Sequence, residues 1–154
     1  MMAYRIEGLA AEMFAPLFEM DEHELAERNA RRAVADGPGY PCRVSLEEAE
    51  PGEALVLVNH VSNAAATPFR ASHAIFVRER AERGAYEDGV PAIFATRTLG
   101  LRGFDAEGML RGALLALPGE ADARIRELLE RPEVSEIHAH NAALGCFLAR
   151  IERN

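Results

Sequence analysis

The C-terminal segment, residues 135–153, carries the most restrictive pattern in the chain. Two runs, 135–141 and 145–153, each place an apolar residue at nearly every second position, and a short connection with Gly145 at its end joins them. A period of two is typical of a β-strand with one buried face, and glycine suits the positive backbone angle that ends a tight turn. The segment therefore predicts an antiparallel β-hairpin.

The length of the connection decides which side chains share a face, because directly opposed residues of an antiparallel pair point the same way. A three-residue loop, residues 142–144, places His140 opposite Cys146, whereas a four-residue loop mixes Phe147 with His140. We prefer the first register, because it predicts one wholly apolar face: Ile137, Ala139, Phe147, Ala149 and Ile151. The other face then carries His138, His140, Cys146, Leu148 and Arg150.

Two longer apolar runs, 54–61 and 72–79, are expected to be central strands of a sheet that also includes the hairpin. Further strands are expected within 4–8, 31–36, 91–97 and 109–117, with a glycine-rich bend over 98–108. Apolar spacing predicts helices over 10–18 and 121–130, and Asp21 with Glu24 fits a capping box that opens a short helix. These elements predict an α+β fold: a single domain over 1–154 with a mostly antiparallel sheet, a C-terminal β-hairpin and helices packed on one face.

Composition narrows the class of protein. The 154 residues are 49% apolar, which suffices for one core, and no apolar run is long enough for a membrane helix. The first residues lack the pattern of a signal peptide, so we expect a cytoplasmic protein with both cysteines as thiols and no membrane partner. The net charge of −8 would repel a phosphate backbone, so no nucleic-acid partner is expected.

All 17 basic residues are arginines, and the missing lysine excludes whole reaction classes. Schiff-base enzymes, pyridoxal-phosphate enzymes, P-loop nucleotidases and protein kinases each need a lysine at the reacting centre. The arginine-only composition, with abundant alanine, is typical of a GC-rich bacterial genome. Four arginines could clamp a carboxylate or phosphate, but this bias reduces their weight: Arg43, Arg70, Arg97 and Arg102.

Four histidines indicate where a site would lie. His60 ends one predicted central strand and His73 begins the next, while His138 and His140 share one face of the hairpin. The leading hypothesis is a binding module for a small polar or anionic ligand in a histidine-rich pocket. Its predicted ligand-binding residues are His60, His73, His138, His140, Asn141 and Arg43.

Three other hypotheses stay open. Alternate strand residues point the same way, so His138 and His140 could share a metal ion with Cys146, although no cofactor or metal is predicted by default. A hydrolytic or thiol-dependent enzyme could instead use Cys146 or Cys42 as nucleophile with His138 or His140 as base. The third hypothesis is an interaction or scaffold domain without a site. The sequence leaves the oligomeric state open.

Three stretches together resemble a known bacterial family. They are PCRVSL from residue 41, VNH at 58–60 with PFRASHAIFVRE from residue 68, and IHAHNAALGCFLARIER over 137–153. The family is catalogued as domain of unknown function 1203, and the resemblance covers nearly the whole chain. It implies a small stand-alone cytoplasmic protein of proteobacteria or actinobacteria, and it carries no activity, ligand or catalytic residue over to this chain.

Overall fold

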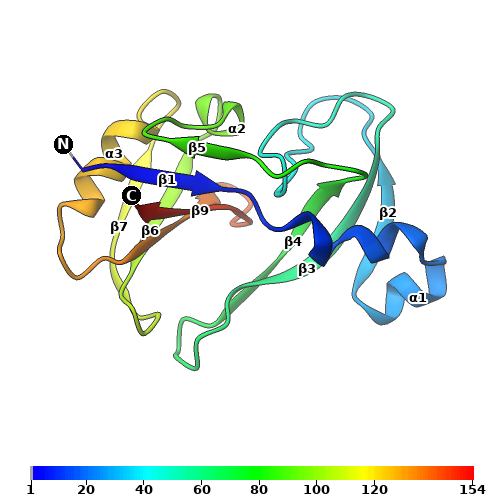
Figure 1. The fold of residues 1–154 in the computed structure, drawn as a ribbon, viewed down its shortest axis with the longest axis horizontal. Coiled ribbons are helices and arrows are strands. Elements are labelled where there is room, and N and C mark those ends of the chain that lie inside the picture. Colours follow the sequence, from blue (N-terminus) through cyan, green and yellow to red (C-terminus); the bar gives the residue numbers. More distant parts are fainter. Residues whose placement is uncertain (1) are drawn as a thin grey trace.

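The structure, a computed structural model, describes residues 2–154 and contains two antiparallel β-sheets (Figure 1). The six-stranded sheet has the order β5-β1-β9-β8-β6-β7, and its strands are β1 (Tyr4–Glu7), β5 (Ala85–Glu87), β6 (Leu99–Phe104), β7 (Leu110–Ala116), β8 (Glu136–Asn141) and β9 (Phe147–Arg153). The three-stranded sheet has the order β2-β3-β4, with β2 (Ala30–Val34), β3 (Ala54–Asn63) and β4 (Ala71–Arg78). The α+β class, the mostly antiparallel pairing and the C-terminal hairpin are confirmed.

The placement of the central strands was predicted only in part. β3 lies in the middle of its sheet, as expected, but β4 is an edge strand. The C-terminal hairpin of β8 and β9 belongs to the other sheet, so the expectation of one shared sheet was wrong. Apolar residues on both faces of a strand require only that both faces be covered. They do not specify which strands pair with it.

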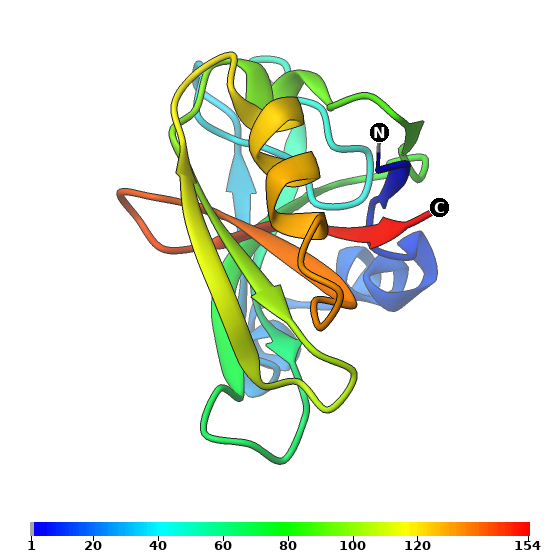
Figure 2. The same cartoon turned by 90° about the vertical axis from the view of Figure 1, so that its left-hand side faces the viewer.

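Helices cover one face of each sheet. Figure 2 shows α3 (Ala121–Leu129) lying across the six-stranded sheet, where Ile125 and Leu128 are fully buried. The short helix α1 (Glu22–Glu27) and the 3-10 turns η1 (Ala11–Met13) and η2 (Ala15–Glu19) pack on the three-stranded sheet. The Asp21 side chain accepts a hydrogen bond from the backbone N–H of Glu24, which confirms the capping box.

Two local predictions were wrong. The strand expected over 91–97 is the helical turn α2 (Ala92–Ala95), in which the adjacent Ile93 and Phe94 are both buried. The bend expected over 98–108 is mostly the strand β6. Gly103 lies inside that strand because a Cβ there would come within 3.0 Å of the Val134 side chain. Glycine at 103 therefore permits close packing and does not mark a turn.

The hairpin register also differs from the prediction. Four residues, 142–145, connect the strands, and His140 lies opposite Phe147. One extra residue in β9, Leu148, then forms a β-bulge, after which the apolar residues of both strands share the core face again. Phe147 consequently points to the histidine side, and Leu148 takes its place in the core.

The two sheets contact each other through loops and side chains. The backbone carbonyl of Gly108, between β6 and β7, accepts hydrogen bonds from the side chains of Asn63 and Thr67, each at 3.3 Å, at the tip of β3 and β4. Arg43 donates from Nε to the carbonyl of Phe147 at 2.8 Å. These contacts between the sheets support the prediction that the chain forms a single domain.

Within residues 2–154, none of the helices has the length and apolar character needed to cross a membrane.

Candidate functional site

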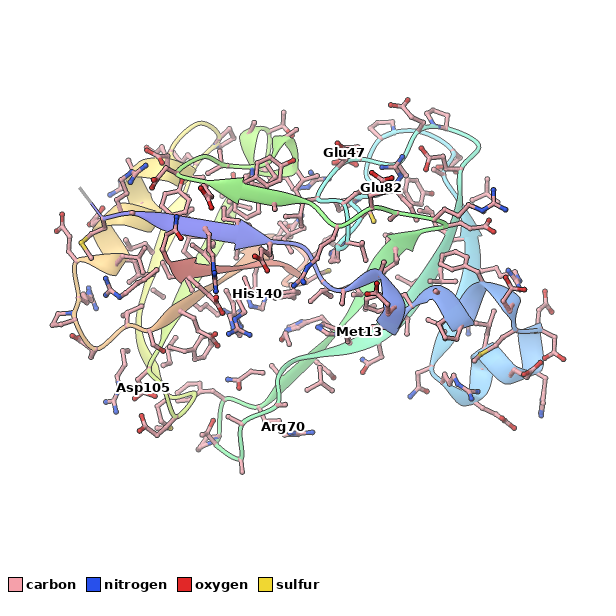
Figure 3. The ribbon with its side chains drawn as sticks, viewed as in Figure 1. Met13, Glu47, Arg70, Glu82, Asp105 and His140 are labelled. Carbon is pink, nitrogen blue, oxygen red and sulfur yellow. The ribbon has the colours of Figure 1, made fainter. Side chains whose placement is uncertain are left out.

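The structure brings the four predicted histidines together between the two sheets. His60 and His73 are directly opposed on β3 and β4, and His138 and His140 occupy alternate positions of β8. The His73 and His140 rings pack edge to face with centroids 4.9 Å apart. Figure 3 shows His140 near the middle of the molecule, between the six-stranded and three-stranded sheets. We call these four residues the histidine cluster.

Phe147 lies at the centre of the histidine cluster. Its ring centroid is 5.8 Å from that of His60, 5.6 Å from that of His138 and 5.9 Å from that of His140. The phenyl ring is 2% exposed, so it keeps water from much of the imidazole surface. Sequence reasoning missed this role, because it assigned Phe147 to the core face.

Burial favours the neutral form of His60, His73 and His140. His140 is 2% exposed, and burial lowers its pKa to about 4 despite its hydrogen bond with the Gly145 carbonyl at 3.0 Å. Since a carbonyl only accepts, the proton of neutral His140 lies on Nδ1. Burial, as the largest cause, also lowers the pKa of His60 and of His73.

His73 holds a polar atom without a partner. Its Nε2 is enclosed by protein and has no hydrogen bond among residues 2–154. Such an atom costs stability, on the order of 1–3 kcal/mol, and edge-to-face packing on the His140 ring offsets only part of that. A buried polar atom without a partner calls for an explanation, and a bound ligand would supply one.

Arg102 adds a charge that no protein group balances. It lies directly opposite His138 on the adjacent strand β6, is half-buried, and makes no hydrogen bond or ion pair with the described part of the chain. After burial, its charge is a further cause of the lowered pKa values of His73 and His140. By contrast, Arg150 on the other side of His138 pairs with Glu136 at 2.6 Å.

Two of the predicted ligand-binding residues have structural roles. The buried Arg43 donates to the carbonyls of Phe147 and Pro41, at 2.8 and 2.6 Å, and so ties β9 to the loop that follows β2. Burial lowers the pKa of Arg43 to about 10, which leaves it protonated at neutral pH. Asn141 accepts the backbone N–H groups of residues 143 and 144 and thereby shapes the hairpin turn.

The two cysteines differ in their exposure to solvent. Cys42 is fully buried in the core beside β4, and its sulfur accepts a weak hydrogen bond from the backbone N–H of Arg78 at 3.3 Å. A substrate could reach that sulfur only through local opening. Cys146 is half-buried at the end of the hairpin turn, and both thiols are free.

His138, His140 and Cys146, the three residues considered as metal ligands, do not form a metal site in the structure. Across residues 2–154, no three His, Cys, Asp or Glu side chains are arranged to hold a metal ion. His138 instead shares a hydrogen bond of 3.0 Å with Glu136, and His140 is bonded to a backbone carbonyl. Arg102, beside the histidine cluster, is an unbalanced cation, and such a group suits an anion. The His138–Glu136 pair also has the form of an oriented general base.

The family model described as a protein of unknown function (DUF1203) matches residues 39–153. The matched region contains the entire histidine cluster, Phe147 and Arg102, and the match confirms the resemblance drawn from the sequence. No curated protein and no solved structure matches the chain.

Proposed function

We propose that this chain, which belongs to the DUF1203 family, is a cytoplasmic bacterial protein that binds a small anion at the histidine cluster through Arg102. One observation carries the proposal: Arg102 is half-buried beside His138 and has no counter-charge within residues 2–154. A guanidinium removed from water is unfavourable unless it is paired, and a bound anion would supply the missing partner. The free thiols are consistent with a reducing compartment.

The surroundings of Arg102 favour an anion over a cation. Glu136, two residues from His138 on the same strand, is already engaged by His138 and by Arg150, at 3.0 and 2.6 Å. The pKa of Glu136 is lowered, chiefly by the hydrogen bond with His138, so this carboxylate stays charged and committed. The planar guanidinium of Arg102 can meet a carboxylate or phosphate with two parallel hydrogen bonds.

The test is isothermal titration with acetate and with inorganic phosphate at pH 7.5 and low ionic strength. Arg102→Gln should weaken binding about tenfold or more, since a charge-assisted pair contributes about 1.5–3 kcal/mol. Arg31→Gln is the matched control, because Arg31 is exposed on β2 of the other sheet. Equal affinities for the parent and Arg102→Gln would reject the proposal. Urea unfolding of each variant checks that the fold is intact.

A hydrolytic enzyme is the second candidate function, and the His138–Glu136 pair favours it. A carboxylate that accepts from an imidazole fixes its tautomer and orientation, as general-base catalysis requires. The measurement is hydrolysis of p-nitrophenyl acetate by the parent, Glu136→Gln and Cys146→Ser. A general-base role predicts loss of rate in Glu136→Gln with acetate binding retained, and a thiol role predicts loss in Cys146→Ser. A parent no faster than buffer eliminates both for this substrate class.

A further inference from the structure

Open space lies over Gly100 beside the histidine cluster, and we call this space the hollow. Gly100 is directly opposed to His140 on β8 and to Leu115 on β7, so a side chain at 100 would point toward the same side as the His140 ring. A Cβ built on Gly100 would have no atom within 4 Å, yet the residue is only half-exposed. Between the side chains of His140 and Leu115, Gly100 itself therefore fills none of this space.

Nothing in the backbone requires glycine at this position. Gly100 is not among the residues with a positive φ, and it sits in a regular stretch of β6. Gly103, on the opposite face of the same strand, differs because Val134 and Leu128 press against it. Glycine at 103 is thus explained by close packing inside the protein, whereas glycine at 100 leaves space that the protein itself does not fill.

The residues around the hollow differ in polarity, since one is charged and another is apolar. Arg102 lies two residues along β6 on the same face, about 7 Å away along the strand. On the edge strand β7, Leu115 is 57% exposed and borders the hollow from the side opposite His140. A molecule whose anionic group meets Arg102 would thus lay the rest of its body over Gly100 and against an apolar side chain.

We propose that the ligand is a small amphipathic anion, a monocarboxylate whose short hydrocarbon chain or single ring occupies the hollow between Gly100, His140 and Leu115. This inference rests on the proposed anion binding at Arg102 and deepens it by naming the class of ligand. Each buried methylene should then tighten binding about fourfold.

The test compares acetate, butyrate, hexanoate and benzoate by isothermal titration. In the parent, hexanoate should bind at least tenfold more tightly than acetate. Gly100→Leu, which fills the hollow, should remove that gain while acetate binding changes little. Gly37→Leu is the matched control: Gly37 also has nothing within 4 Å of a built Cβ and no positive φ, but it lies in the loop after β2.

Leu115→Ser provides a second variant in case Gly100→Leu is poorly folded, because an exposed edge residue tolerates a polar side chain. It should reduce the preference for hexanoate and leave acetate binding intact. A parent that binds acetate through Arg102 but prefers no longer chain overturns this inference and leaves anion binding standing. A hexanoate preference that survives both Gly100→Leu and Leu115→Ser also overturns it. Loss of the Arg102 effect itself overturns both proposals.

Discussion

The neutral His140 imidazole should make the protein sensitive to mild acid. Its pKa is about 4 in the folded chain and has the ordinary value of 6.5 in the unfolded chain. Between these values the unfolded state binds more protons, so the free energy of unfolding falls as the pH drops through this window. For these two pKa values, lowering the pH from 7.5 to 5 removes about 2 kcal/mol of stability through His140 alone.

Urea unfolding at pH 7.5 and 5 measures this loss in the parent and in His140→Gln. The variant should lose about 2 kcal/mol less than the parent over the same pH change, because glutamine does not titrate. His60 and His73 contribute acid sensitivity to both proteins, so the difference isolates His140. His23→Gln is the control, since that side chain is 85% exposed on α1, and it should behave as the parent does. Equal pH dependence in the parent and His140→Gln would refute the assignment of a neutral buried imidazole.

Four further substitutions test packing and helix capping by urea unfolding at pH 7.5. Phe147→Ala should cost about 3–5 kcal/mol through lost burial and a cavity among the imidazoles, and a cost below about 1 kcal/mol would contradict its central position. Gly8→Ala should destabilise by more than about 2 kcal/mol, because its Cβ would lie 1.8 Å from the carbonyl oxygen of Val44. Gly37→Ala, with open space around it, should stay within about 0.5 kcal/mol of the parent. Asp21→Ala should cost about 1 kcal/mol by removing the capping box, and no change would show that α1 is held by packing alone.

The candidate site was predictable in its members but only partly in its assembly. Neighbouring strands and alternate positions within one strand suffice to pair His60 with His73 and to align His138 with His140. The meeting of these two pairs depends on two sheets facing each other, which no local pattern encodes. Arg102 is one of four arginines that could clamp an anion, and the arginine-only composition gives none of the four particular weight. The significance of Arg102 comes from the lack of a partner, which is visible only once the positions of all the carboxylates are known.

The features that the sequence determined by itself depend on composition and on interactions between residues close together in the chain. The capping box starts α1, the apolar spacing places α3, and the charge and the missing lysine exclude classes of chemistry. The tertiary structure decided the rest, because the same local pattern permits several pairings. A single β-bulge at Leu148 reversed the side to which Phe147 points, and packing against Val134 turned a predicted glycine-rich bend into β6. Both outcomes depend on contacts between residues distant in the sequence, and so does the hollow over Gly100.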